Sequence, residues 1–119
     1  GDKQTEEVAN IIDDGEITES EMNALKSVAD GAISSLKQKK YSAEQLVDKY
    51  SSNPKAKEYA EKAVELYGKA ISYLEDMVAS NDANTIAKDY KVAKNYEMSG
   101  DYYSDAAQKE FYGQHDQAE

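Results

Sequence analysis

The sequence contains no cysteine and no tryptophan, and it has a single proline, phenylalanine and histidine. Without cysteine, disulfides, thiolate metal sites and a cysteine nucleophile are excluded, while the redox compartment stays open because Cys-free domains occur in both. Arginine is also absent, since all 14 basic residues are lysine. The net charge of −10 and the missing guanidinium fork therefore disfavour binding to DNA, RNA or an anionic membrane.

Long apolar runs are missing as well, and none approaches the roughly 20 residues that a membrane span requires. The chain has 119 residues, of which 39% are hydrophobic and 32% charged, and this length and composition fit a single domain. This composition predicts a thin core made largely of alanine and tyrosine. The acidic charge is concentrated near the start, because residues 1–30 hold nine acids and two lysines.

The chain begins with Gly1 and has no initiator methionine. We therefore expect that an upstream segment, such as a signal peptide or a lipoprotein leader, was removed. This favours an extracytoplasmic location, either secreted or lipid-anchored. A composition with lysine as its basic residue and much asparagine and tyrosine suits an AT-rich genome, so a bacterial or prophage origin is expected.

Helix is the only regular structure that the pattern supports, because apolar residues recur every three or four positions and strand-like alternation is missing. A short first helix is expected to end at Gly15. Thr18 with Glu21 forms a capping-box pattern that begins a second helix, which should end in the lysine cluster at residues 37–40. Ser42 with Gln45 repeats the pattern and predicts a short third helix that ends at residues 51–53.

A fourth helix is expected to begin at Asn53-Pro54, with asparagine as the N-cap and proline in the first turn. Residues 80–82 should end it, and a fifth helix should run to a C-cap at Gly100. A sixth would run from about residue 102 to Tyr112. The apolar stripe of the fourth helix is the most regular in the chain and comprises Ala60, Ala63, Val64, Tyr67, Ile71, Leu74 and Val78.

These elements predict an all-α fold, a compact bundle of about five or six helices in a single domain. We expect the bundle to cover residues 1–112 and residues 113–119 to form a flexible C-terminal tail. Gly31 and Gly68 lie inside helical patterns, where a close crossing of helices is the simplest explanation.

The segment from Asn10 to Glu21 resembles an EF-hand calcium loop, with Gly15 at the sharp turn and Glu21 as the final bidentate carboxylate. The third loop position holds Ile12 where such loops have Asp or Asn, so a bound ion would lose a carboxylate ligand. We interpret the segment as a helix stop followed by the Thr18 cap, with weak divalent-ion binding as an alternative.

Residues 14–19 also resemble the helix-turn-helix of small acidic bacterial domains of the tellurite-resistance type and of phage helical proteins. That likeness covers about a dozen of the 119 residues and assigns no family. The residues from Gly100 to Tyr102 resemble the turn of a tetratricopeptide repeat, without a 34-residue period upstream.

The ten tyrosines are interpreted mainly as packing residues, because a chain with one phenylalanine has few other large side chains. Tyr102 and Tyr103 are the exception, since two adjacent residues of one helix cannot both face inward. One of them should be exposed and available to a partner.

No catalytic triad, phosphate-binding glycine loop or paired acid with a cleft partner is found, so we expect no enzyme, no cofactor and no metal. The favoured function is a non-enzymatic helical interaction or scaffold module that binds a protein partner. An acidic inhibitor or nucleic-acid mimic is the alternative, and clustering of carboxylates on one face would favour it. The candidate partner-binding residues are Glu16, Glu19, Glu21, Tyr102 and Tyr103.

Overall fold

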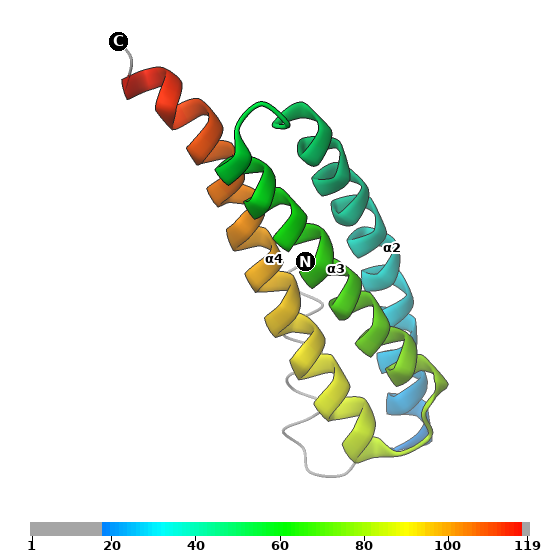
Figure 1. The fold of residues 1–119 in the computed structure, drawn as a ribbon. Helices are drawn as coiled ribbons and strands as arrows, with labels where there is room; N and C mark the ends of the chain where they lie inside the picture. Colours follow the sequence, from blue (N-terminus) through cyan, green and yellow to red (C-terminus); the bar gives the residue numbers. More distant parts are fainter. Residues whose placement is uncertain (1–17, 118–119) are drawn as a thin grey trace.

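The computed structural model describes residues 18–117, and they form three α-helices joined by two short turns (Figure 1). The helices are α2 (Glu19–Lys49), α3 (Pro54–Ala79) and α4 (Ala83–Gln117). No strand occurs in this part of the chain. The all-α class is therefore confirmed, and the expected count of five or six helices is not matched, because residues 18–117 form three long helices where the second to sixth expected helices would lie.

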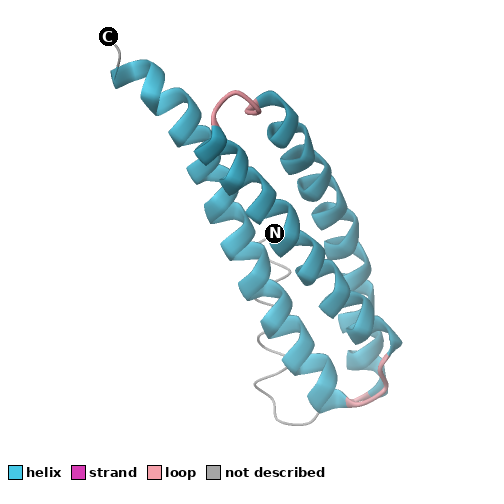
Figure 2. Ribbon diagram, in the orientation of Figure 1, coloured by secondary structure: helices cyan, strands magenta, loops and turns pink. Residues whose placement is uncertain are grey.

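Consecutive helices run antiparallel, so α2 and α4 point the same way and α3 points the opposite way, with the two turns at opposite ends of an elongated bundle (Figure 2). The principal extents are 57 × 22 × 17 Å. Helix α3 packs extensively on both neighbours, while α2 and α4 contact each other little. Helix α4 is the longest, and its C-terminal turns project past the α2–α3 turn (Figure 1). None of the three described helices has an apolar stretch that could cross a membrane.

Helix α2 continues through the break that Ser42 was expected to introduce. Leu36, Ala43 and Tyr50 are all buried and follow one another at intervals of seven residues, so the apolar phase is kept across the predicted break. Ser42 and Gln45 are exposed in the middle of α2, so their capping-box spacing does not mark the start of a helix. The separate third helix was a wrong prediction because the heptad phase outweighs a local cap pattern.

Helix α4 likewise continues through Gly100, so the C-cap, the sixth helix and the repeat-like turn at this position were wrong. Gly100 is buried and lies seven residues from Ala93 and from Ala107, both of which are buried. A Cβ atom at Gly100 would lie 2.7 Å from Cε1 of Tyr67. The glycine is therefore a close-contact position in the helix seam, where only a missing side chain leaves room for the tyrosine ring.

The close crossings expected at the other two helical glycines are not found. A Cβ at Gly31 would meet no heavy atom within 4 Å, and one at Gly68 would touch only the end of Lys40, at 3.8 Å. The close approach that the sequence suggested is thus real, but it occurs at a different glycine.

The predicted first helix and most of the loop up to Gly15 lie outside the described residues. At the other end, α4 is helical through Gln117, beyond the end expected at Tyr112. The flexibility of residues 113–119 stays a prediction.

All three described helices begin at capping residues. Both hydrogen bonds of the expected capping box are present, from Glu21 N to Thr18 Oγ1 at 3.1 Å and from Thr18 N to Glu21 Oε1 at 3.1 Å. The Asn53 side chain accepts from Ala56 N at 3.1 Å, and Asp82 accepts from Thr85 N at 3.1 Å. The predictions for Thr18, Asn53 and the break at residues 80–82 are confirmed.

The core seam of α3 alternates steps of four and three residues, the spacing that packs a helix against nearly parallel neighbours. Four alanines at this seam let α2 and α4 approach closely. The predicted stripe is confirmed in its main positions, although Val64 and Val78 are only half-buried. The buried seam positions are Ala56, Ala60, Ala63, Tyr67, Ala70, Leu74 and Met77.

The interpretation of the tyrosines as packing residues holds for only part of the set. Tyr50, Tyr67 and Tyr90 are buried in the core. Near the α2–α3 turn, the ring of Tyr50 stacks on Phe111 with centroids 4.4 Å apart. Four tyrosines remain exposed on the surface, namely Tyr41, Tyr73, Tyr102 and Tyr112.

A polar network ties the middle of the bundle together. Lys39 on α2 binds Glu97 at 2.9 Å and Asp101 at 3.1 Å, both on α4. The buried hydroxyl of Tyr67 donates to Asp101 Oδ1 at 2.6 Å. Burial of the phenol, reinforced by the Asp101 carboxylate, raises the pKa of Tyr67. Burial alone would raise the pKa of Glu97, but the hydrogen bonds from Lys39 and Lys94 lower it below its ordinary value.

Asp89 on α4 is a buried acid outside this network. Only 5% of its surface is exposed, and its Oδ2 atom has no hydrogen-bond partner in the described structure. Burial, and then the neighbouring Asp76 side chain, raises the pKa of Asp89 from 3.8 to about 6. Lys88 acts in the opposite direction and only partly offsets this effect.

We expect Asp89→Asn to stabilise the fold at pH 7 by about 1 to 2 kcal/mol. One unit of pKa shift corresponds to about 1.4 kcal/mol, and solvent around the exposed Asp76 weakens the repulsion between the two carboxylates. Between pH 3.8 and 6 the folded chain binds a proton that the unfolded chain has lost, so wild-type stability should fall as pH rises through this window. The advantage of the variant should therefore disappear below about pH 4.

Urea unfolding of both proteins at pH 4 and pH 7 measures this difference. The exposed Asp30 provides the control, because Asp30→Asn should change stability by less than about 0.5 kcal/mol at either pH. A loss of stability in Asp89→Asn at pH 7 would show that the ionised carboxylate is favourable where it lies.

Candidate functional site

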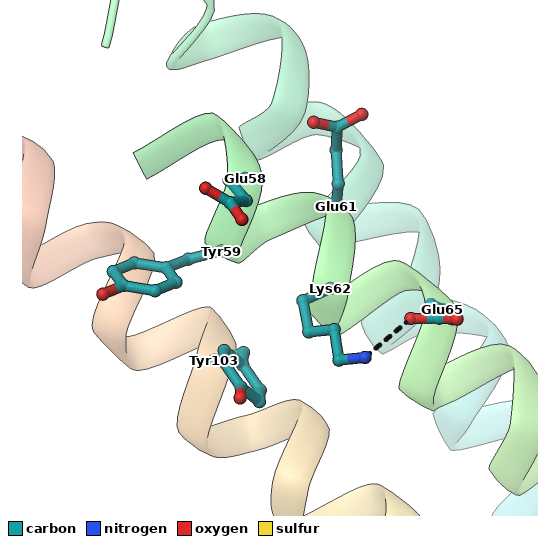
Figure 3. Close-up of a pocket in the computed structure, with 6 residues that line it drawn as sticks. All are labelled: Glu58, Tyr59, Glu61, Lys62, Glu65 and Tyr103. Carbon is teal, nitrogen blue, oxygen red and sulfur yellow. Dashed lines mark hydrogen bonds and ion pairs between the residues drawn. The ribbon is translucent and has the colours of Figure 1, made fainter. Parts of the chain in front are cut away.

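The outer face of α3 lies between two hollows of the surface. The first lies between α3 and α4, has a volume of about 610 Å³ and is open to solvent (Figure 3). Its lining combines carboxylates with two tyrosine rings and one lysine, contributed by Glu58, Tyr59, Glu61, Lys62, Glu65 and Tyr103.

The helical seam explains why these side chains share one face. Because Ala56, Ala60 and Ala63 are turned into the core, Glu58, Glu61 and Glu65 fall on the outer side of α3. Tyr59 points from α3 toward α4, where its ring centroid lies 6.0 Å from that of Tyr103 (Figure 3). The two rings bound the hollow on the α4 side.

The second hollow lies between α2 and α3 and has a volume of about 490 Å³. Two half-buried valines form its apolar part, Val47 on α2 and Val64 on α3. Four carboxylates and no lysine make up the rest of the lining, which consists of Glu44, Asp48, Glu61 and Glu65. Glu61 and Glu65 belong to both hollows, so the two form one continuous surface.

We call the five carboxylates of this surface the α3 acidic face, comprising Glu44, Asp48, Glu58, Glu61 and Glu65. Glu65 is neutralised locally, because Lys62 Nζ donates to it at 3.0 Å and Lys69 Nζ lies 3.9 Å away. The Lys62 hydrogen bond accordingly lowers the pKa of Glu65. No ion pair within the described part of the chain joins the other four to a lysine.

This arrangement is suited to binding cations. Exposed carboxylates accept charge-assisted hydrogen bonds from ammonium groups, and tyrosine rings attract the same groups through their faces. The chain itself makes such contacts, since Lys55 lies 5.9 Å from the centroid of Tyr59 and Lys69 lies 5.7 Å from that of Tyr96. Among the described residues, no group of three or more His, Cys, Asp or Glu could hold a metal ion.

Of the acids chosen from the sequence, Glu19 and Glu21 lie at the other end of the bundle. Glu16 is outside the described residues, and Glu19 is exposed in the first turn of α2. Glu21 is half-buried and holds the Thr18 cap, so its carboxylate already has a partner. The α3–α4 turn lies at the same end, where Lys26 Nζ of α2 donates to Asn81 Oδ1 at 3.2 Å.

The two candidate tyrosines divide as expected. Tyr102 is 69% exposed, while Tyr103 is half-buried and lines the α3–α4 hollow. Their rings meet edge to face with centroids 5.4 Å apart. Of the four selected residues that the structure describes, only Tyr103 lines one of the two hollows.

None of the five carboxylates of the α3 acidic face is among the candidate residues chosen from the sequence, because acids and lysines are interspersed on the outer side of α3 as on an ordinary solvated helix face. Lys62 follows Glu58 by four residues but donates to Glu65 instead, so no ion pair within the described residues joins Glu58 to a lysine. The spacing of Glu58, Glu61 and Glu65 on one helix face was a signal for part of the cluster. The contribution of α2 required the pairing of the helices to be known.

A model of the family described as PT26-6P, helical domain, matches residues 1–119. The chain belongs to this family. The family description agrees with the three helices of the structure. No curated protein and no solved structure matches the chain. In this member of the PT26-6P helical-domain family, the α3 acidic face and its two hollows form the candidate binding surface.

Proposed function

We propose that the chain is a non-enzymatic helical interaction module that binds a cationic protein partner through the α3 acidic face. The observation that carries the proposal is a group of four carboxylates that form no ion pair with any described lysine, Glu44, Asp48, Glu58 and Glu61, around two hollows with valine and tyrosine side chains. Like charges placed together repel one another, and a cationic partner removes this cost.

The clustering is local. Residues 18–117 contain 17 acids and 13 lysines, so the described helices are much closer to balance than the whole chain with its net charge of −10. Elsewhere on the bundle, Glu97, Asp105 and Glu110 each lie within 4.0 Å of a lysine. An acidic patch on an otherwise balanced surface favours a defined docking site over general solubility.

The same clustering supports the second candidate, an acidic inhibitor or nucleic-acid mimic that covers a basic site on its partner. The two candidates use one surface and differ in the partner. Competition separates them: a mimic is displaced from its partner by short duplex DNA or RNA, whereas an ordinary protein partner is not.

Divalent-ion binding through the loop at residues 10–21 stays a further alternative. Residues 10–17 are outside the described structure, and Glu21, the residue in the final ligand position, holds the capping box. If millimolar calcium raised the melting temperature by several degrees, this alternative would gain support.

Neutralising the acidic face should slow association with a lysine-rich helical peptide by about tenfold at 50 mM salt, because exposed charges act mainly on the encounter rate. The variant is Glu44→Gln, Asp48→Asn and Glu61→Gln together. Stopped-flow fluorescence with a labelled peptide gives the rate, and raising salt to about 300 mM should remove most of the difference.

The matched control removes the same charge from three exposed acids elsewhere, Asp30→Asn, Glu75→Gln and Asp105→Asn. It should retain the wild-type association rate within about twofold. Equal slowing in both triple variants would mean that net charge alone attracts the peptide, and the proposal would be abandoned.

A further inference from the structure

Resting on the proposed function, we infer that the α2–α3 hollow receives a single amphipathic helix of the partner protein. An apolar side chain of that helix lies on Val47 and Val64, and lysines or arginines on its two flanks reach the carboxylates of α2 and α3.

The lining of this hollow defines both requirements. Val47 and Val64 are half-buried, so an apolar group placed on them loses contact with water. The other lining residues are Glu44, Asp48, Glu61 and Glu65, and within the described residues only Glu65 forms ion pairs with lysines. A purely apolar segment would leave the other three carboxylates facing it without partners, and a purely cationic segment would leave the valines uncovered.

The spacing of the carboxylates favours a helical partner. Glu44 and Asp48 are four residues apart on α2, and Glu61 and Glu65 are four residues apart on α3. Four residues of helix span about 6 Å along the axis, so each pair forms a short row on one flank of the hollow. Cations at positions i and i+4 of a docked helix have the same spacing.

An extended segment fits this surface less well. The backbone groups of α2 and α3 are already bonded within their helices, so they offer nothing to the unpaired N–H and C=O groups of a strand. A helix satisfies its own backbone and can rest in the groove between two neighbours, as a further member of a helical bundle does.

Charge disfavours two other occupants of the hollow. Residues 1–17 contain six acids and one lysine, so this segment has few of the cations that the carboxylates require. A second copy of the chain would bring its own net charge of −10, and Lys39, one of the three lysines in residues 37–40, is held by Glu97 and Asp101. The charge of this surface therefore favours a basic segment of another protein as the occupant of the α2–α3 hollow.

The test uses the full chain and three helical peptides of equal charge. The first carries a central leucine with two lysines four residues apart on each flank of it, the spacing of the carboxylate pairs. The second replaces this leucine by serine. The third has the composition of the first in an order that moves the leucine to the opposite side of the helix from the lysines. Isothermal titration should show the first peptide binding about five- to tenfold more tightly than either other peptide, as expected for burial of one leucine.

On the protein side, Val47→Thr with Val64→Thr should remove this preference for leucine. Val92→Thr is the matched control, since Val92 is a half-buried valine of α4 that does not line the hollow. It should leave the preference within about twofold. The peptide comparison needs no variant, so it decides the inference even if the double substitution loosens the fold.

The outcomes separate this inference from the proposed function. If all three peptides bind equally and still depend on Glu44, Asp48 and Glu61, the acidic face stands and the amphipathic helix is wrong. If peptide binding does not depend on these carboxylates, the proposed function and the amphipathic-helix inference are both wrong. If sedimentation shows a dimer that the double valine variant abolishes, the occupant is a second copy of the chain, and the inference is overturned.

Discussion

Leu74→Ala is expected to lower the free energy of unfolding by about 2 to 5 kcal/mol, the largest effect of any single substitution considered for this chain. Leu74 is 2% exposed and lies in the α3 seam, in the core cluster that contains residues of all three helices. Truncation removes buried apolar atoms and leaves a cavity that neighbouring alanines such as Ala70 are too small to fill.

Urea denaturation followed by circular dichroism measures the change. Glu75→Ala, on the exposed side of the same helix, should alter stability by less than about 0.5 kcal/mol. A comparably small loss for Leu74→Ala would show that α3 is not the centre of the bundle.

Gly100→Ala is expected to cost about 1 to 3 kcal/mol, although alanine is the better helix former by up to about 1 kcal/mol. The new Cβ would lie 2.7 Å from Cε1 and 2.8 Å from Cδ1 of Tyr67. That ring cannot move aside easily, since Tyr67 is 3% exposed and its hydroxyl is bonded to Asp101. The clash should therefore outweigh the gain in helix propensity.

Gly31→Ala is the same substitution in a helix interior with no heavy atom within 4 Å of the new Cβ. It should stabilise the fold by up to about 1 kcal/mol. Opposite signs for the two variants, measured by thermal or urea unfolding, are the expected result. A stabilised Gly100→Ala protein would mean that α3 and α4 are further apart at this point than the structure places them.

Helix starts could be predicted from the sequence because their causes are local. Thr18 with Glu21, and Asn53 before Pro54, place hydrogen-bond acceptors where the first turn of a helix needs them. The same local reasoning failed at Ser42 and Gly100, because helix continuity there depends on packing with α3. The seven-residue spacing of Leu36, Ala43 and Tyr50 was visible in the sequence and was the stronger signal.

The candidate site was less accessible to sequence reasoning. Glu16, Glu19 and Glu21 attracted attention because acids are dense near the start of the chain, whereas the cluster at the α2–α3 groove combines residues 17 positions apart, such as Glu44 and Glu61. Which faces of α2 and α3 come together is set by their heptad phases. Tyr103 was identified because adjacent tyrosines on a helix must face different directions.

Residue-resolved NMR titration of the full ¹⁵N-labelled chain with the leucine–lysine peptide tests the proposed binding surface most directly. The largest amide shift changes should fall at residues 44–48 and 61–65, which flank the α2–α3 hollow. They should weaken as salt rises from about 50 to 300 mM. Largest changes around Tyr102 or near Glu19, or changes spread evenly over all three helices, would contradict binding through the α3 acidic face.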